Sequence, residues 1–533
     1  MKKLFVFAIM ALVSSTAAFA QWNTDATPVT VFSTANYNGL DHAVSIKAVR
    51  TPDKKTWLSW KKWDSILVNG FKVLADRTYL QLLDINGVPQ FEEPLVVNNH
   101  MTPSWHSDYS LCVAADGSAI VTLADARLEE NEVTEDDQSA YTFCPAIYKI
   151  DQEGNFLWGL DGIAFEEFND SPFTLAYVVG EDTYFGFNLP TSEEGNQLYI
   201  YRIDDDGTLG WEEPMIVETI QCEIVPSLDG DFLFFDDCND GARVRRLNRN
   251  GEDVWNEPII YDPNKYSGYA LHQYKAVPDG DGGAAVAFVR AMGQFSHNIR
   301  VQHVNADGSL GFGLEGLDAA NTEDNDYDYC GVAVNPNTQE IMVDFESQLE
   351  STYDVMLQKF SYDGEYLFDE LGLSIAHKNR SNTFSFARVG IGSVGESDWI
   401  VSYRDVEGYG ARNSFIIRRY DKDGNRVWTK TIGRNLDCTA INMIVEPEAT
   451  YLFYREFSEE KGPGVKMFRI GSDGTYNVTY DIPEDPTCIK NTNGVSTASK
   501  RYFTVDGRQI SQPQSGLNIV KDGNGSVRKY VIE

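Results

Sequence analysis

Basic residues, histidines and long apolar runs are scarce in this chain of 533 residues. Lysine and arginine number 44 against 80 aspartates and glutamates, which gives a formal net charge of −36. Such an excess of negative charge repels phosphate backbones and anionic lipid surfaces, so neither nucleic-acid nor membrane-surface binding is expected. An acidic surface that keeps a protein in solution accounts for the charge, and calcium or a cationic partner is compatible with it.

Sequence signatures of catalysis and of metal binding are also missing. The chain has no Gly-x-Ser-x-Gly, no His-Glu-x-x-His and no Walker motif, and its seven histidines show no ligand spacing. No Cys-x-x-Cys occurs among the seven cysteines. The sequence therefore identifies no catalytic residue, no cofactor site and no metal site.

The cysteines are odd in number, so at least one of them is expected to remain a thiol. The spacing favours a disulfide between Cys222 and Cys238, which flank a predicted Asp229-Gly230 hairpin at matched distances and would face each other across two strands. Cys112 with Cys144 is a second option within one repeat.

A long apolar run occurs only at the N-terminus. Two lysines, an apolar stretch from Leu4 to Val13 and the sequence Ala18-Phe19-Ala20 are typical of a cleaved secretory signal. Residues 1–20 are thus predicted to be a signal peptide, with the mature protein starting at Gln21. No other stretch approaches the roughly 20 apolar residues of a transmembrane helix, so an exported protein without such a helix is expected.

The chain does contain a repeat. Eight times a strand-like run enters a turn with a glycine, and in seven of the eight the fourth residue after that glycine is Phe or Trp. Successive glycines lie 44 to 67 residues apart, which indicates stacked or radial copies of one supersecondary unit. The pairs are Gly87 with Phe91, Gly154 with Trp158, Gly207 with Trp211, Gly251 with Trp255, Gly308 with Phe312, Gly364 with Phe368, Gly424 with Trp428, and Gly474 with Val478.

Each repeat is predicted to hold four antiparallel strands. Runs rich in β-branched and aromatic residues precede the glycine turns, aspartates in the turns favour tight hairpins, and a second hairpin lies upstream of each. Four strands in about 55 residues are the content of a propeller blade. The sequence therefore predicts an all-β fold, a β-propeller of about eight four-stranded blades over residues 42–487, with seven blades as the alternative.

The segments on either side of the repeats have separate roles. Gln21-Trp22 followed by Pro28 to Phe32 looks like a fourth strand without a blade, and the last repeat has the weakest fourth strand. Residues 21–41 are therefore expected to supply a strand that closes the ring. A polar linker is predicted over residues 488–500, and a small C-terminal β tail over residues 501–533.

The tail resembles those of exported Bacteroidetes proteins. An aromatic pair precedes the turn Asp506-Gly507-Arg508, a Gly-x-x-Ile-Val strand starts at Gly516, and a basic-apolar strand ends the chain. This motif order is similar to that of the sorting domains read by the type IX secretion system, and the resemblance covers residues 501–533 alone. It implies passage to the cell surface or the medium through that machinery. The tail is shorter than a full sorting domain and ends on Glu533 where the family has a basic residue, so a periplasmic location is the alternative.

The repeats resemble propeller repeats of uncharacterised exported Bacteroidetes proteins, which implies a fold and no activity. A monomeric binding or scaffolding module for a glycan or protein partner is the leading hypothesis. The alternatives are a carbohydrate-active enzyme, a lyase or glycosidase with its carboxylates around a central channel, and an accessory protein of the cell envelope. Three tryptophans that the blade pattern does not require are candidates for stacking on a ligand: Trp57, Trp60 and Trp63.

Overall fold

The computed structural model describes residues 21–33, 43–68, 70–98, 109–128, 141–165, 173–189, 197–217, 222–238, 241–263, 272–291, 297–320, 326–349, 352–379, 384–407, 413–458, 462–478, 501–504, 509–510, 516–521 and 527–532. The predicted signal peptide and the linker lie outside these ranges. No helix in the described parts of the chain is long and apolar enough to cross a membrane. The chain divides into two compact units, residues 1–479 and residues 480–533.

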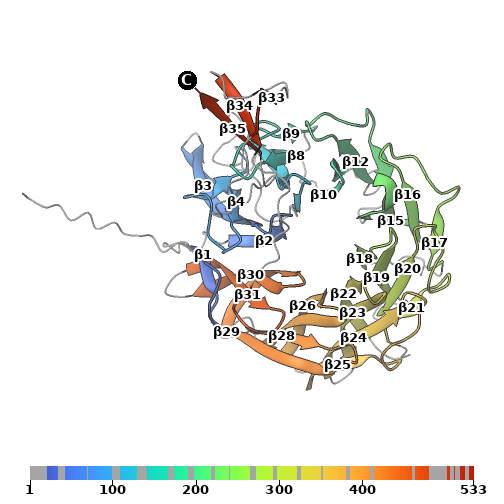
Figure 1. Ribbon diagram of the computed structural model, residues 1–533. Helices are drawn as coiled ribbons and strands as arrows, with labels where there is room; N and C mark the ends of the chain where they lie inside the picture. The colour runs from blue at the N-terminus through green and yellow to red at the C-terminus, as the bar shows by residue number, and fades with distance from the viewer. Residues whose placement is uncertain are drawn as a thin grey trace, which may run out of the picture. The chain divides into compact units, whose positions relative to one another are not determined.

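The first unit is a β-propeller of eight blades, which confirms the predicted fold and the larger of the two blade counts (Figure 1). The first three blades are β2 (Ala43–Arg50), β3 (Thr56–Val68), β4 (Phe71–Leu83) and β5 (Leu95–Val96); β6 (Leu111–Val113), β7 (Ala119–Leu128), β8 (Tyr141–Ile150) and β9 (Ile163–Ala164); and β10 (Thr174–Val179), β11 (Asp182–Leu189), β12 (Gln197–Ile203) and β13 (Met215–Val217).

The next three blades repeat this order. They are β14 (Cys222–Pro226), β15 (Phe232–Cys238), β16 (Gly241–Leu247) and β17 (Ile259–Tyr261); β18 (His272–Pro278), β19 (Ala284–Ala291), β20 (His297–Val304) and β21 (Leu317–Asp318); and β22 (Asp326–Asn335), β23 (Glu340–Leu349), β24 (Thr352–Ser361) and β25 (Leu373–Asn379). One 3-10 turn, η2 (Leu228–Gly230), joins β14 to β15. Within each blade the strands pair antiparallel in sequence order, with the first strand innermost and a short fourth strand outermost.

The last two blades share one long strand. β26 (Phe384–Val394), β27 (Asp398–Glu407), β28 (Asn413–Tyr420) and the first part of β29 (Arg426–Val445) form the seventh blade. From Asp437 onward β29 pairs instead with β30 (Ala449–Ser458), which pairs with β31 (Gly462–Gly471). The outer strand of blade seven thus continues as the inner strand of blade eight.

The N-terminal strand β1 (Val29–Ser33) supplies the outermost strand of the eighth blade. It pairs antiparallel with β31, Val29 opposite Met467 and Ser33 opposite Gly464. The two ends of the propeller are therefore held together by a sheet that contains both of them. The sequence predicted a strand that closes the ring within residues 21–41, and β1 lies in that segment.

Apolar cores lie between consecutive blades. Seven clusters of buried side chains each combine residues of two neighbouring blades, from the first and second to the seventh and eighth. Because a blade packs against a neighbour on each face, both sets of alternating side chains in its middle strands are buried. Val286 and Ala287, for example, are both inaccessible to solvent and belong to two different clusters.

The repeated aromatic residues connect each blade to the next. A β-carbon built on the turn glycine of one blade would come within 2.7 to 3.2 Å of the aromatic side chain from the blade before it. Each of these glycines has a φ between 79° and 89°, so a residue without a side chain suits both the backbone and the contact. The contacts are Phe91 on Gly154, Trp158 on Gly207, Trp211 on Gly251, Trp255 on Gly308, Phe312 on Gly364, Phe368 on Gly424 and Trp428 on Gly474.

Trp22 completes this series. Its indole lies against Gly87 of the first blade, where no preceding blade within the sequence can provide an aromatic. Trp22 Nε1 donates to the carbonyl of Ile85 at 3.0 Å, as Trp158 Nε1 donates to that of Asp205 at 3.1 Å, and both carbonyls belong to the second residue before a turn glycine. The N-terminal segment therefore replaces both the outer strand and the aromatic residue that the eighth repeat lacks.

The second unit contains one four-stranded antiparallel sheet in the order β33 (Gln509–Ile510), β32 (Arg501–Thr504), β34 (Gly516–Lys521) and β35 (Val527–Ile532). Three of these strands correspond to the motifs that carry the resemblance to sorting tails. The small C-terminal β tail predicted from the sequence is thus confirmed as a sheet.

Candidate functional site

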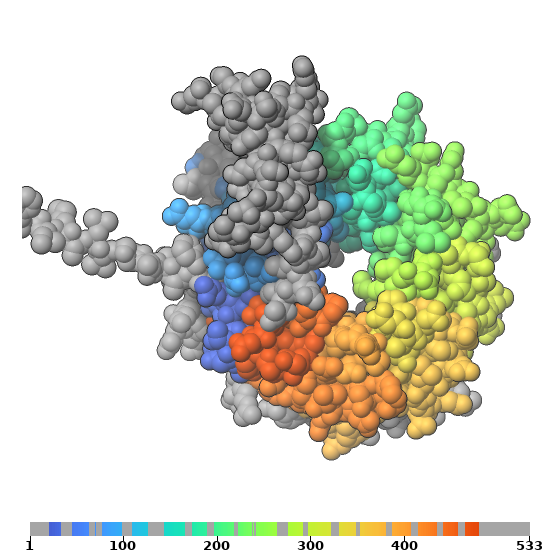
Figure 2. Space-filling view, viewed as in Figure 1, coloured from blue at the N-terminus to red at the C-terminus, as the bar shows by residue number. Residues whose placement is uncertain are grey.

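The eight blades surround an opening, and their innermost strands form its wall (Figure 2). One polar side chain from each of the first seven innermost strands lies in a single layer along this wall. We call the layer the channel girdle, and it consists of Lys47, Cys112, Tyr177, Glu223, Lys275, Cys330 and Arg388. Successive members lie on neighbouring blades and interact electrostatically with each other.

Three neighbouring members form the centre of the girdle. The Tyr177 hydroxyl donates to the carbonyl of Cys222 at 2.8 Å and lies 3.4 Å from Glu223 Oε2. On the other side Lys275 Nζ lies 3.4 Å from Glu223 Oε1. The third, fourth and fifth blades thus contribute a phenol, a carboxylate and an ammonium group to one connected cluster.

The environment of this cluster shifts the pKa of its carboxyl group. Burial raises the pKa of Glu223, although Lys275 and the Tyr177 hydroxyl act in the opposite direction. Burial and the neighbouring carboxylate raise the pKa of Tyr177 well above its ordinary value. The Glu223 side chain is 17% exposed and that of Lys275 is 61% exposed, so the ammonium is the more accessible of the two charges.

The two cysteines of the girdle are thiols with little nucleophilic character. Burial raises the pKa of Cys112 to about 12 in spite of the nearby Lys47. Burial likewise raises the pKa of Cys330 to about 12 in spite of Arg388 and Lys275. Since thiolates are the reactive form of cysteine, these two side chains act as small polar parts of the wall.

Arg388, a member of the girdle on the seventh blade, also contacts buried carboxylates of the sixth blade. Its guanidinium makes two hydrogen bonds to the fully buried carboxylate of Asp344, Nε to Oδ2 at 3.1 Å and Nη2 to Oδ1 at 3.0 Å. Its backbone N–H donates to Glu346 Oε1 at 2.7 Å. A bidentate geometry of this kind fixes the relative position of two blades as well as the guanidinium.

A cavity of about 430 Å³ lies where the innermost strands of blades eight, one, two and three turn back. Small apolar residues form much of its lining, among them Val113 and Val178, which directly follow Cys112 and Tyr177 of the girdle. The charged groups of the lining are Arg50, Lys54 and Glu446, and the two cations contact Glu446 at 3.3 and 3.4 Å. The channel therefore offers a partly apolar space next to a polar layer.

This arrangement can bind a polar ligand and can exchange a proton with it. Lys275 provides N–H donors, Glu223 provides a carboxyl group that either accepts or donates, and Tyr177 provides a hydroxyl. A titratable side chain with a shifted pKa in a concave site is a mark of functional sites, and Glu223 meets that description.

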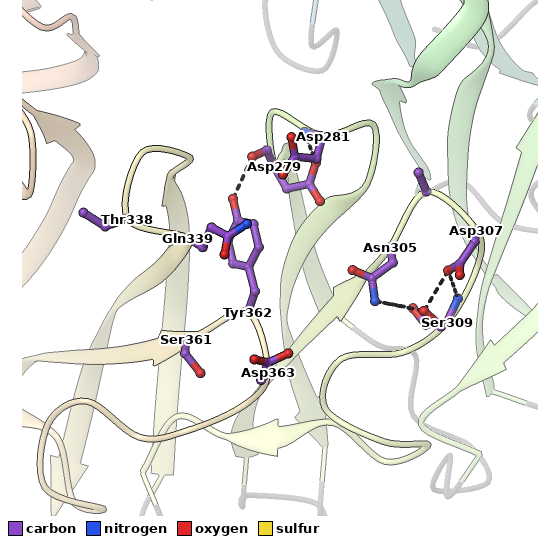
Figure 3. A pocket seen from close by; sticks show the side chains of 11 residues that line it. Asp279, Asp281, Asn305, Asp307, Ser309, Thr338, Gln339, Ser361, Tyr362 and Asp363 are labelled. Atoms are coloured by element: carbon purple, nitrogen blue, oxygen red, sulfur yellow. Dashed lines mark hydrogen bonds between the residues drawn. The ribbon is translucent and has the colours of Figure 1, made fainter.

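A second cleft, of about 530 Å³, lies between the turns of the fifth and sixth blades (Figure 3). Almost all of its lining is polar: Asp279, Asp281, Asn305, Ala306, Asp307, Ser309, Thr338, Gln339, Ser361, Tyr362 and Asp363. Many of these groups are already used within the turns, since Asp307 Oδ1 accepts from both the backbone N–H and the hydroxyl of Ser309. The cleft wall is therefore mainly a set of turns held by their own side chains.

Behind this cleft a buried histidine and aspartate of the fifth blade are hydrogen-bonded to each other and to Tyr362 of the sixth blade. His303 Nε2 lies 3.0 Å from Asp279 Oδ2, and His303 Nδ1 lies 3.1 Å from the carbonyl of Tyr362. The Tyr362 hydroxyl donates to the carbonyl of Asp279 at 2.6 Å. Burial opposes ionisation of Asp279, but the hydrogen bonds from His303 and from the N–H groups of Asp281 and Gly283 outweigh it and lower the pKa of this carboxyl.

Replacing Asp279 by asparagine is expected to reduce the free energy of unfolding by about 3 kcal/mol at pH 7, because a buried imidazole loses its carboxylate. The pKa of Asp279 is depressed in the folded state, so its contribution is complete above the unfolded value near 3.8 and disappears as pH falls through the lower folded value. Urea unfolding at pH 7 and at pH 2 measures the difference. Asp281→Asn, in the same turn but exposed, is the control. Equal losses in both variants, or a difference that persists unchanged at pH 2, would contradict this role.

The tryptophans predicted to stack on a ligand are placed differently. Trp57 and Trp60 have no exposed surface. Trp57 packs in the core between the first two blades and donates from Nε1 to the carbonyl of Gly117 at 2.9 Å. Trp60 packs on the opposite face of its strand against Phe32 of β1 and Tyr79. Neither indole offers a face to a ligand, so the stacking hypothesis is wrong for both; the side chain of Trp63 lies outside the described part.

The predicted disulfide between Cys222 and Cys238 is not formed. Cys222 lies opposite Asp236, and Cys238 is two residues further along β15, opposite Gly241 on β16. Diagonal positions on two adjacent strands are about 7–8 Å apart, beyond the usual span of a disulfide. Cys112 and Cys144 form no disulfide either.

The described residues hold no group of three or more His, Cys, Asp or Glu side chains placed to share a metal ion. The girdle was not predicted from the sequence, although some of its charged residues interrupt an apolar stretch of a first strand. Glu223 within Cys-Glu-Ile-Val and Lys275 within Tyr-Lys-Ala-Val are examples.

Comparison with known proteins finds no matching family model and no matching curated protein. Solved structures do match. They include a protein of unknown function from Dyadobacter fermentans (11% identity, TM-score 0.33, covering 83% of this chain and 98% of that one). They also include an ulvan lyase of a new polysaccharide lyase family (9%, 0.40, 84% and 98%) and the β-propeller domain of the trilobed protease from Pyrococcus furiosus (11%, 0.37, 74% and 99%). Similarity at this level does not extend to function.

Proposed function

We propose that this chain is an exported binding module whose propeller takes a glycan in the central channel. The observation that carries the proposal is the cluster of Tyr177, Glu223 and Lys275, which brings three polar groups from three blades to one place on the channel wall. Sugar hydroxyl groups both donate and accept hydrogen bonds, so a wall with carboxyl, ammonium and phenol groups matches them. The adjacent cavity supplies space for the apolar face of a sugar ring. Export rests on the N-terminal signal pattern and the tail resemblance.

A glycan array probed with the purified chain tests this function. The wild type is expected to retain a subset of glycans, and Tyr177→Phe and Lys275→Ala are each expected to weaken that binding by about tenfold, or ~1.4 kcal/mol. Lys422→Ala is the matched control, because this lysine is 63% exposed on the outer turn between β28 and β29. Glycan binding that the channel variants leave unchanged would place the ligand elsewhere, and an array without any bound glycan would refute the proposal.

A glycan-cleaving enzyme at the same position is the second candidate, and the raised pKa of Glu223 beside a phenol favours it. A carboxyl group that titrates closer to neutral pH is suited to transfer a proton to or from a sugar. Every glycan retained on the array would be incubated with the chain and assayed for new reducing ends. If the wild type cleaves a glycan, Glu223→Gln is expected to abolish turnover while binding persists. A wild-type protein that releases no new reducing ends would refute the enzyme and leave glycan binding as the only proposed function.

A further inference from the structure

Lys275 differs from the other members of the girdle in its accessibility. Its side chain is 61% exposed, whereas Glu223 is 17% and Arg388 21% exposed, and Cys330 is buried. Lys275 Nζ approaches one oxygen of Glu223 at 3.4 Å, a long contact. An ammonium group has three N–H donors. A cation that is accessible from the channel and weakly held by its partner is a site for an anionic group of a ligand.

The remaining charges of the girdle do not oppose an anion there. Lys47 and Arg388 are cations, and Asp344, the acidic partner of Arg388, is fully buried and neutralised by two hydrogen bonds. Among the seven side chains of the girdle, Glu223 is thus the one whose negative charge an anionic ligand would encounter. In a chain with a net charge of −36, this section of the channel is a local exception.

An anion bound to Lys275 would lie close to Glu223, and two negative charges at that distance repel each other. A proton on Glu223 removes the repulsion and turns its carboxyl group into a donor toward the ligand. The groups that act on Glu223 are Lys275 of β18 and Tyr177 of β10, while Asp236 of β15 acts on the neighbouring Cys222. Burial already disfavours the charged form of Glu223, which lowers the cost of protonating it.

We propose that the glycan bound in the channel carries a carboxylate or sulfate group that pairs with Lys275, and that Glu223 takes up one proton when it binds. The inference rests on the proposed function and specifies its ligand class as an acidic glycan. Affinity for such a ligand then falls as pH rises, by up to about tenfold per pH unit above the titration of Glu223.

The test uses the full purified chain and three probes of equal length: tetragalacturonate, sulfated cellotetraose and neutral cellotetraose. Calorimetric titrations in two buffers of different ionisation enthalpy give the affinity and the number of protons exchanged. At least one anionic probe is expected to bind ten or more times tighter than the neutral one, with uptake of one proton. The two anionic arms distinguish a carboxylate from a sulfate.

Variants separate the two parts of the inference. Lys275→Ala is expected to remove the preference for anionic probes, and Lys422→Ala is expected to retain it. Glu223→Gln is expected to keep the preference but to exchange no proton and to lose the pH dependence. A merely structural Glu223 would not alter proton uptake.

Three results would contradict the inference or the proposed function, and they can be distinguished from one another. Equal binding of neutral and anionic probes, sensitive to Tyr177→Phe, would overturn the acidic ligand and leave the proposed function standing. Anionic binding with the same proton uptake in the Glu223→Gln variant would overturn the role of Glu223. Binding of none of the probes, combined with an array that retains no glycan, would overturn both the inference and the proposed function.

Discussion

Replacement of Trp22 by alanine is expected to loosen the ring between the eighth and first blades and to reduce the free energy of unfolding by about 3–5 kcal/mol. The indole is 4% exposed and lies against the rings of Tyr451 and Phe453, with centroids 5.2 and 6.0 Å apart, and under the guanidinium of Arg469. Its backbone N–H and its Nε1 both donate to the turn that contains Gly87. These contacts hold the N-terminal segment to the first blade, while the pairing of β1 with β31 holds the same segment to the eighth blade.

Hydrogen exchange locates the effect. In Trp22→Ala, protection is expected to fall first in β31 and in the turn from Asp84 to Gly87, since these backbone groups flank the closure. Trp158→Ala is the matched control, because Trp158 makes the same contact at a junction where the outer strand comes from the same repeat as the rest of its blade. If both variants lose the same protection at their own interfaces and the same stability, closure by Trp22 has no special importance and the prediction fails.

Replacement of Gly331 by alanine is expected to destabilise the propeller by about 3–5 kcal/mol, as large an effect as breaking a buried ion pair. A β-carbon at this position would overlap both Arg388 Nη2 and Asp344 Oδ1. The guanidinium must then move away and leave the fully buried Asp344 carboxylate without its counter-ion. The absence of a side chain at Gly331 thus leaves the space in which Arg388 of the seventh blade contacts Asp344 of the sixth.

The control for this substitution is Gly390→Ala, a glycine on the innermost strand of the next blade. A β-carbon there would meet Met443 at 3.4 Å, an ordinary van der Waals distance, so a small change in stability is expected. The urea midpoint of each variant provides the comparison. A double variant, Gly331→Ala with Asp344→Asn, is expected to cost less than the sum of the two single changes, because the buried negative charge is gone. Similar midpoints for Gly331→Ala and Gly390→Ala would contradict the steric explanation.

The blade count was predictable because the glycine and the aromatic occupy fixed positions in a short local motif. The turn, the positive φ and the contact with the next blade depend on residues within one repeat and on a copy of the same repeat. Val478, which breaks the motif, indicated correctly that the eighth repeat is incomplete. That Trp22 supplies the absent aromatic follows only from three-dimensional closure, since more than 450 residues separate it from Val478.

The tryptophan and cysteine hypotheses failed for different physical reasons. Alternation along a strand separates an inner from an outer face, but both faces of a blade are covered by neighbours, so Trp57 and Trp60 are both buried. The cysteine prediction centred its hairpin on Gly230, whereas Pro226 pairs with Phe232 and centres the turn on Asp229. An error of one residue at the turn displaces the opposite residue by two, from Asp236 to Cys238.

The channel girdle could not be derived from single strands. Glu223 and Lys275 are 52 residues apart and belong to different sheets, so their contact depends on the angle between two blades. Tyr177 in isolation is an ordinary half-buried strand residue. The chemistry of the site arises from how repeats are arranged, which composition and local pattern do not contain.

The pairing of β1 with β31 also has a consequence for the time at which the protein reaches its final form. The hydrogen bond from Lys466 Nζ to Thr30 Oγ1 joins residues 436 positions apart. Synthesis proceeds from the N-terminus, so β1 is made before all eight blades, and its partner strand β31 is complete only when Gly471 has been added. During that interval β30 and β31 are still absent, and seven blades can assemble in order while the first one keeps an uncovered edge. Any factor that shields this edge would act before β31 is complete, and the strand that is made first is paired with one of the last strands of the propeller.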